Sequence, residues 1–319
     1  MSASLKIFRG TPRTASAGFT LVELMVSITV LALLGGLVMQ LMGSASKLTS
    51  TSKLASDCDT EARYALNQIA ADITHRVRRP DVDAFVDKLD GDDRLYLFSE
   101  TPGYSASLDA TQRSDVSLVG YRVSISVNAF SKKVYKLERY SKALPWSASG
   151  PDIPMPYVVL DATTGLPTPE STLAGTGGGA GGSFKTVITQ DSTEDVYYQP
   201  IAENVVRFEV SVLRKPDLTT TPPTDARLLK DAEIPTELSR YGFSNIAAIV
   251  VTIAVLDSQN ATRVDDGDLA KLQQLSDASA TDFPKLPLDV WNTTFLTNAT
   301  SWRKPVTNGL RLYQRVIGL

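Results

Sequence analysis

The chain has very few of the residues that build metal and nucleophilic sites. Its 319 residues include one cysteine, Cys58, and one histidine, His75. A single cysteine excludes an intrachain disulfide, and so few residues exclude most His/Cys metal sites and a supported Cys–His catalytic pair. The Gly-x-Ser-x-Gly pattern of many serine hydrolases is also missing. We therefore do not expect an enzyme.

Charge is nearly missing from residues 19–42, where Glu23 is the only charged side chain. A bilayer core of about 30 Å needs about 20 apolar residues in a helix. Residues 19–42 therefore form a candidate transmembrane helix. Gly35, Gly36 and Gly43 weaken this helix, and they indicate either close packing between helices or a segment that can stretch in an assembly.

Acidic residues are missing from residues 1–17, which carry Lys6, Arg9 and Arg13. Positive charges ahead of a span stay in the cytoplasm, so the C-terminal bulk of the chain should lie on the other side of the membrane. A secretory signal has its small-residue cleavage site after the apolar core. Here the small residue, Gly18, lies before the apolar core, and residues 1–18 have the composition of a short basic leader.

Glu23 is an unusual residue for an apolar helix. A carboxylate in the bilayer centre costs about 2.5–3.5 kcal/mol on insertion scales. Two interpretations are open. Glu23 is either an acid tolerated near the membrane interface or a group that finds a positive partner inside an assembly.

The order of these features is specific: a basic leader, Gly18, then Phe19-Thr20-Leu21-Val22-Glu23 and an apolar run. This order resembles the N-terminal signature of type IV prepilins and type II secretion pseudopilins. The resemblance is tight over residues 18–42 and general beyond them. In that family a prepilin peptidase cuts after the glycine and methylates the new amino terminus. The resemblance therefore implies cleavage between Gly18 and Phe19 and N-methylation of Phe19.

The resemblance also implies partners and a location. Glu23 would be the fifth residue of the mature chain and would pair with the Phe19 amine of a neighbouring subunit, because a buried charge needs a partner. Other pilins or pseudopilins would bind through the N-terminal helix, and an inner-membrane platform would assemble them. The chain would cross the inner membrane once, with its headpiece in the periplasm or, in a filament, outside the cell.

A narrower resemblance concerns the whole chain. Its length and the hairpin expected near residues 117–140 are similar to those of large minor pilins and J-type pseudopilins. The closing Gly-Leu-Arg-Leu-Tyr-Gln-Arg-Val-Ile-Gly-Leu, together with the overall length, resembles the C member of a Verrucomicrobial (Verru_Chthon) cassette of prepilin-like proteins. Such proteins would be priming or tip subunits, because a large headpiece crowds a bulk helical filament.

An apolar stripe at helical period continues beyond the span. It consists of Cys58, Ala62, Leu66, Ile69, Ile73 and Val77. The other faces carry Lys53, Asp57, Glu61, Arg63, Asn67, Gln68 and Asp72. This pattern predicts that residues 43–79 form an amphipathic continuation of the helix, which Pro80 ends. Cys58 should pack as a small hydrophobe. Residues 75–79 include His75, Arg76, Arg78 and Arg79. Positive charges stabilise the C-terminal end of a helix, and the alternative role is a contact with a partner or with lipid headgroups.

Beyond Pro80 the apolar period changes from helical to extended. Alternating or continuously apolar segments predict strands at residues 94–98, 117–127, 134–140, 157–160, 184–188, 196–198, 205–213, 246–256 and 310–317. A short helix is expected at residues 268–275. We therefore predict an α+β fold, in which a long N-terminal helix packs on an antiparallel β-sheet headpiece formed by residues 80–319. Residues 141–183, rich in Pro and Gly, should form a flexible loop.

Two acidic turns are the remaining candidate ligand sites. They comprise Asp90-Gly91-Asp92-Asp93 and Asp265-Asp266-Gly267-Asp268. Carboxylates of this kind can hold Ca²⁺, but neither turn fits the EF-hand loop, so solvated turns are the simpler interpretation and no cofactor is expected. Trp146, Trp291 and Trp302 could anchor a partner, although tryptophans in such positions more often cover the edge of a core.

Three kinds of function fit these features to different degrees. A minor pilin or pseudopilin explains Gly18, Phe19 and Glu23 together. A membrane-anchored binding or adhesion protein that does not polymerise explains the span but gives Glu23 no task. A DNA-uptake pilin would need exposed basic and aromatic clusters, and the formal net charge of −3 gives nucleic-acid binding little support.

Overall fold

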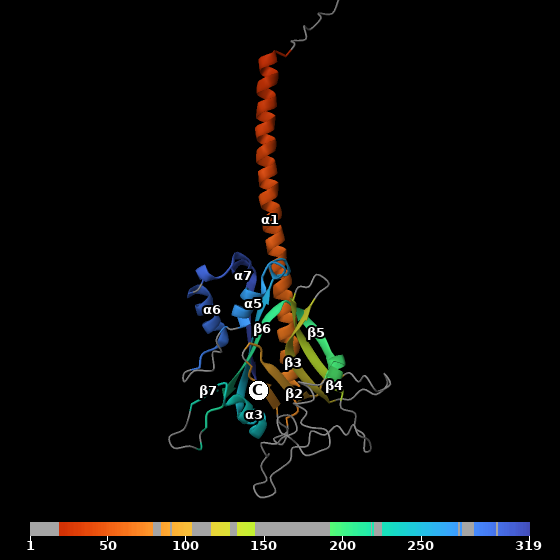
Figure 1. The fold of residues 1–319 in the computed structure, drawn as a ribbon, viewed down its shortest axis with the longest axis vertical. Helices are drawn as coiled ribbons and strands as arrows, with labels where there is room; N and C mark the ends of the chain where they lie inside the picture. The colour runs from red at the N-terminus through yellow and green to blue at the C-terminus, as the bar shows by residue number, and fades with distance from the viewer. Residues whose placement is uncertain are drawn as a thin grey trace, which may run out of the picture. The chain divides into compact units, whose positions relative to one another are not determined.

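The structure is a computed structural model that describes residues 19–78, 84–89, 91–103, 116–127, 133–143, 192–217, 219, 225–273, 275, 284–297 and 299–319. The chain divides into two compact units, Met1–Lys53 and Leu54–Leu319. Figure 1 labels α1 and many of the helices and strands of the second unit. The leader, including Gly18, and the predicted strands at 157–160 and 184–188 lie outside the described residues. So does the expected loop from residue 144 onward.

The N-terminal helix, α1, comprises Leu21–Thr74 and is 54 residues long. It ends five residues before the predicted end at Arg79, because the chain after Thr74 pairs with a strand instead of continuing the helix. His75 is a turn residue, Arg76 forms an isolated antiparallel bridge with Ser99, and the Val77 N–H donates to the Phe98 carbonyl at 2.9 Å. The prediction that the helix continues to residue 79 was therefore wrong at its C-terminal end.

The first sheet has five antiparallel strands in sequence order, β1-β2-β3-β4-β5. Their bounds are Ala84–Asp87, Arg94–Ser99, Ser117–Val127, Lys133–Ala143 and Tyr198–Glu203. The predicted hairpin is confirmed, with Tyr121 of β3 opposite Arg139 of β4. Strand β4 extends to Ala143, so the start of the expected loop at 141 was wrong. The predicted strand at 196–198 was also misplaced, since β5 starts at Tyr198.

The second sheet has four antiparallel strands in the order β7-β6-β8-β9. Their bounds are Val205–Arg214 for β6, Arg227–Leu228 for β7, Ile246–Leu256 for β8 and Leu310–Gly318 for β9. Strand β8 lies in the centre and is almost entirely buried, as its continuous apolar sequence predicts. Asn204, in the left-handed conformation with φ 55°, separates β5 of one sheet from β6 of the other.

Short helices connect and cover the strands of the headpiece. They are η1 (Ser192–Tyr197), α3 (Ile234–Tyr241), α4 (Ser258–Ala261), α5 (Asp266–Gln273), α6 (Pro287–Thr297), η2 (Ala299–Ser301) and α7 (Lys304–Gly309). The predicted helix at 268–275 corresponds to α5, shifted by two residues. Five of these elements, α4, α5, α6, η2 and α7, lie between β8 and β9 in the chain. Hydrophobic residues of α5, α6 and α7 pack with β6 and β8.

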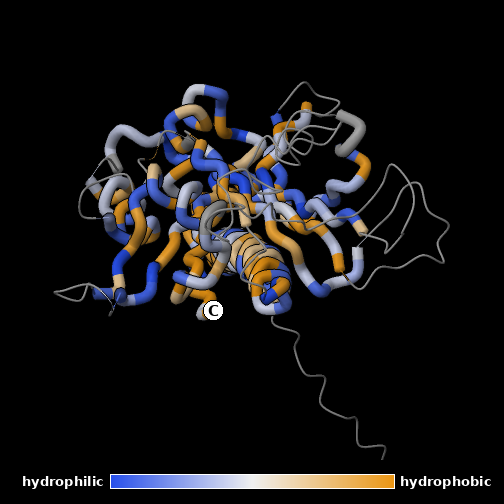
Figure 2. The backbone as a smooth tube through the Cα atoms, turned by 90° about the horizontal axis from the view of Figure 1, so that it is seen from below, coloured by the Kyte–Doolittle hydropathy of each residue, from blue (hydrophilic) through white to orange (hydrophobic). Residues whose placement is uncertain are grey.

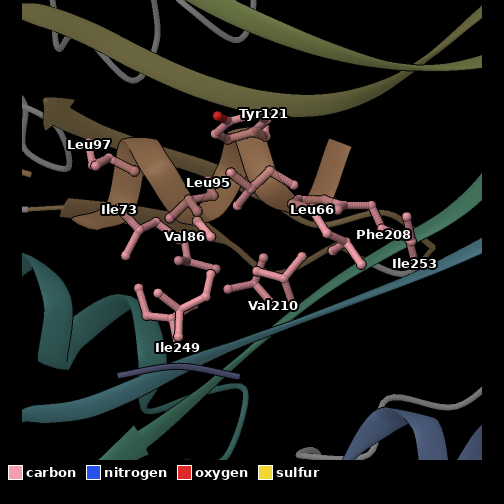
Figure 3. Packing of buried hydrophobic residues seen from close by; sticks show 14 of the residues in the cluster. Leu66, Ile73, Val86, Leu95, Leu97, Tyr121, Phe208, Val210, Ile249 and Ile253 are labelled. Atoms are coloured by element: carbon pink, nitrogen blue, oxygen red, sulfur yellow. The ribbon is translucent and has the colours of Figure 1, made fainter. Parts of the chain in front are cut away.

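The main core lies between α1 and both sheets. Figure 3 shows Leu66 and Ile73 of α1 among side chains from β1, β2, β3, β6 and β8. The predicted stripe is confirmed from Cys58 to Ile73 as the buried face of the helix. Val77 was wrongly assigned to it, since it lies beyond the helix and packs against another cluster. In Figure 2 the tube of the chain changes repeatedly between hydrophobic and hydrophilic colours. The α+β architecture predicted from sequence is therefore present.

A second, aromatic cluster forms on another part of the first sheet. Its members are Phe85, Tyr96, Phe98, Leu118, Tyr140, Tyr197 and Tyr198. The hydroxyls of Tyr96 and Tyr198 are hydrogen-bonded at 2.8 Å, and a Cβ at Gly120 would overlap the Tyr96 ring. These rings are buried, so they form a core rather than an exposed stacking platform.

Candidate functional site

The N-terminal motif begins helix α1. Thr20 precedes the helix, and its Oγ1 accepts a hydrogen bond from the Glu23 N–H at 3.3 Å. The Thr20 hydroxyl in turn lies 3.5 Å from Oε2 of Glu23. The first of these contacts is one half of a capping box, in which the threonine side chain accepts from the N–H three residues later. The Thr-x-x-Glu spacing was visible in the sequence and was not used to place the helix start.

Glu23 is otherwise surrounded by the apolar surface of its own helix. Residues 19–53 are exposed throughout, and Phe19 is 79% exposed. The hydroxyls of Ser27 and Thr29 donate to the carbonyls of Glu23 and Met25 at 2.7 and 2.6 Å. These hydroxyls are thus satisfied within the helix, and Glu23 is the one charged side chain of residues 19–42.

Helix α1 is long and apolar enough to cross a membrane near the N-terminus of the chain. Signal sequences and the core helices of soluble proteins can be equally long and apolar. None of the most hydrophobic window of α1 is buried, however, which is unlike a core helix. The helix thus has the properties of a single-pass membrane anchor.

The first acidic turn supports the edge of strand β6. Asp92 Oδ1 accepts from the Phe208 N–H at 3.0 Å, and Asp93 Oδ2 accepts from the Val210 N–H at 2.7 Å. Lys88 Nζ lies 2.5 Å from Asp93 and 2.6 Å from Glu209. These carboxylates therefore join the two sheets. Asp90 lies outside the described residues.

The second acidic turn holds an arginine. Arg303 forms ion pairs with Asp265 and, at 3.3 Å, with Asp268. The backbone N–H of Asp268 lowers the pKa of Asp265, and Arg303 adds to this effect. In the part of the chain that the structure describes, no group of three or more His, Cys, Asp or Glu residues could hold a metal ion.

The described aromatic and basic candidates mostly contact other residues of the headpiece. Trp291 is fully buried in a cluster with β6 and β8, whereas Trp302 is partly exposed and stacks on Phe295 with centroids 5.3 Å apart. Trp146 lies outside the described residues. Arg76, at the basic helix end, donates to the Ile73 carbonyl at 3.2 Å and lies over the Phe243 ring.

The burial of Asp72 was not predicted from the sequence. Asp72, expected on a solvent face of the helix, is fully buried. Arg139 donates to it through Nε at 2.6 Å and Nη2 at 3.0 Å, and the Tyr121 hydroxyl donates to the same carboxylate. Asp72 falls beside the apolar stripe in the helical projection, so helical period alone could not separate it from the exposed acids.

Comparison with known families gives a match at the N-terminus. Residues 13–39 match the family described as the prokaryotic N-terminal methylation motif. The matched segment contains Gly18, Phe19 and Glu23, and it is the prepilin-type motif expected from the sequence. No curated protein and no solved structure matches the chain.

Proposed function

We propose that this chain is a minor pilin or pseudopilin, a structural subunit of a type IV pilus-like or type II secretion filament. The observation that supports this proposal is the methylation motif at residues 13–39 at the start of an apolar helix that contains one acid. A prepilin peptidase cuts after Gly18 and methylates Phe19. Large minor pilins and J-type pseudopilins, and among them the Verrucomicrobial cassette, are the groups within which we place the chain.

Assembly proceeds through the N-terminal helices. The span lies in the inner membrane with the headpiece in the periplasm, and an assembly platform moves the subunit into a filament with other pilins. There the Glu23 carboxylate pairs with the Phe19 amine of a neighbour, because an unpaired carboxylate among apolar helices is costly.

The subunit is not an enzyme and works without a cofactor of its own. Asp92 and Asp93 already accept from backbone N–H groups, and Asp265 pairs with Arg303, which supports a role without calcium. The formal net charge of −3 and the buried aromatic cluster give nucleic-acid binding no support.

One observation favours a second function. The Thr20–Glu23 contact gives Glu23 a task within its own helix. A membrane-anchored binding or adhesion protein that never polymerises would then also keep this acid.

Two matched variants separate these functions. Glu23→Gln keeps a polar side chain that can still serve the cap but removes the charge, whereas Thr20→Ala removes the cap and keeps the charge. If Glu23 acts in assembly, Glu23→Gln is lost from sheared filaments of the native host while Thr20→Ala is present. If both variants enter filaments as wild type does, the charge of Glu23 is not needed for assembly. If the wild-type chain is missing from sheared filaments and stays in the membrane fraction, the anchored protein is the better description.

A further inference from the structure

The two sheets end in four edge strands, β1 and β5 in the first sheet and β7 and β9 in the second. An exposed edge can pair with another chain, and proteins normally protect it. Strand β1 has only four residues, and its first three are buried. Strand β5 contains Pro200, whose backbone cannot donate a hydrogen bond. Both edges of the first sheet are therefore poor templates for a further strand.

The β7 side of the second sheet is protected by side chains. Strand β7 pairs with only two residues of β6. Farther along β6, the Phe208 N–H donates to Asp92 at 3.0 Å and the Val210 N–H donates to Asp93 at 2.7 Å. The first acidic turn thus occupies the donors that an additional strand would need.

Strand β9 lacks these forms of protection. It has nine residues, contains no proline and pairs with β8 without a bulge. The Asp257 N–H donates to the Gly309 carbonyl at 3.0 Å, and the Leu319 N–H donates to the Ala247 carbonyl at 2.9 Å. Because hydrogen-bonded residues alternate along an antiparallel pair, the odd-numbered residues of β9 direct their main chain toward β8. The main-chain groups that point away from the sheet are those of Leu312, Gln314, Val316 and Gly318.

This outer edge of β9 is open. Among the residues that the structure describes, none donates to or accepts from these outward main-chain groups. The Val316 side chain is 57% exposed, and a Cβ at Gly318 would meet no atom within 4 Å. The outer edge is therefore accessible to a strand from another chain.

The side of this edge that faces α1 is basic. Arg315 donates to Asn67 of α1, so its side chain lies on the α1 side of the strand. Arg311 lies on the same side, because strand side chains alternate with a period of two. Arg63 is exposed one helical turn before Asn67, on the same face of α1. Within the described ranges, no carboxylate forms an ion pair with any of these three arginines.

We propose that the outer edge of β9 is a docking site for an extended acidic segment of another protein. Such a segment adds to the sheet as a strand and bonds to the outward main chain of β9. Its side chains on the α1 side lie opposite Arg311 and Arg315, where acidic residues supply the missing negative charge. On the other side of the strand, an apolar residue covers Val316. This inference concerns the headpiece and does not depend on the filament role.

A second copy of this chain is a poorer occupant of the edge. Antiparallel pairing of β9 with itself places a two-fold axis perpendicular to the sheet, and such an axis keeps the α1 side of both copies on the same side. The arginines at 63, 311 and 315 of both copies would then gather there. Like charges that face each other across strands destabilise the pairing. The charge of the edge therefore favours an acidic partner.

A short synthetic peptide of alternating glutamate and valine, with a fluorophore at one end, is the probe. Fluorescence anisotropy at low salt measures its binding to the full-length chain in detergent. Hydrogen exchange followed by mass spectrometry reports on the amides of residues 310–318. A control peptide of the same sequence carries a methyl group on every backbone nitrogen, which removes its hydrogen-bond donors and keeps its charge.

We expect the unmethylated peptide to bind and to slow exchange in residues 310–318, and the methylated peptide to bind at least about tenfold more weakly. Val316→Pro removes an outward N–H without removing a bond to β8, and proline is tolerated in edge strands. This variant should also weaken binding by about tenfold. Val316→Ala keeps the N–H and should lose much less.

Two further variants test the charge of the edge. Arg311→Gln combined with Arg315→Gln should weaken binding by about tenfold at low salt. Arg78→Gln, which removes an exposed arginine outside this surface, should leave binding unchanged.

Several results would overturn the proposal. If the methylated peptide binds as tightly as the unmethylated one, or if exchange at residues 310–318 does not slow, the contact is electrostatic only and no strand is added. The methylated peptide decides this point even if Val316→Pro does not fold. No binding at about 1 mM peptide would also refute the site. A wild-type dimer with slowed exchange in β9 and no peptide present would identify a second copy as the occupant.

Discussion

The two parts of helix α1 on either side of Lys53 use the same backbone in opposite ways. Residues 21–53 are exposed on every side, with no buried residue. Residues 54–74 include eight buried residues between Cys58 and Ile73, and all of them except Asp72 are apolar. The unit boundary between Lys53 and Leu54 separates them. A helix that is apolar all round needs another apolar medium, whereas one that is apolar on one stripe already has a partner.

Polar residues differ between the two parts as much as apolar ones do. In the first part, hydroxyls bond to their own helix, as Ser27 does to the Glu23 carbonyl. In the second part, polar side chains reach the sheets: Tyr313 donates to Asp59, the Glu203 N–H donates to Glu61 at 2.8 Å, and Arg139 donates to Asp72. The second part is therefore fixed by directed contacts, and the first is left free for a membrane or for other helices.

The largest contrast should come from matched core truncations. Ile69→Ala removes a fully buried side chain of the second part and should lower the free energy of unfolding by about 2–5 kcal/mol. Leu33→Ala, at a position 70% exposed in the first part, should change it by less than about 0.5 kcal/mol. Urea unfolding in detergent, followed by fluorescence of the buried Trp291, measures both. Equal effects would contradict the division of the helix.

A smaller contrast concerns two tyrosines. Tyr121→Phe removes a hydrogen bond to a buried carboxylate and should cost about 1.5–3 kcal/mol. Tyr64→Phe, on the exposed side of the helix, should cost nothing measurable, because the Tyr64 ring is 58% exposed. The same unfolding assay compares them, and a wild-type stability for Tyr121→Phe would show that its hydroxyl is not needed by Asp72.

Much of this contrast was predictable from local sequence. Local sequence alone shows three of these features: the lone acid in residues 19–42, the apolar stripe from Cys58 to Ile73 and the apolar segment of β8. Other features depend on partners far away in the chain. The helix ends at Thr74 because Arg76 forms a β-bridge with Ser99. Asp72 can be buried because Arg139 forms an ion pair with it. Helix α6 was missed because its apolar pattern is irregular and its burial depends on β6 and β8.

Glycines in the first part allow a third prediction. A Cβ at Gly35 or Gly36 would meet no atom within 4 Å. Gly35→Ala should therefore stabilise the helix locally by about 1 kcal/mol and leave the headpiece unchanged. Hydrogen exchange in detergent should slow in residues 30–40 and not in β8. Slower exchange in both regions would indicate that the two parts are energetically coupled.

The smallest effect should come from the first turn. Thr20→Ala removes the capping hydroxyl and should fray the start of α1 at a cost of about 0.5–1 kcal/mol. Amide exchange of Val22 and Glu23 should rise, and the urea midpoint of the headpiece should not move. A shifted midpoint would show that the helix start contributes to headpiece stability.

We propose that the exposed first part of α1 packs against other helices in an assembly after the leader is removed. The most direct test is the mass of the N-terminal peptide of the chain isolated from membranes of its native host. We expect a chain that begins at N-methyl-Phe19. An uncut chain, or one cut beyond Met42, would contradict it and leave a membrane-anchored binding protein as the description of this molecule.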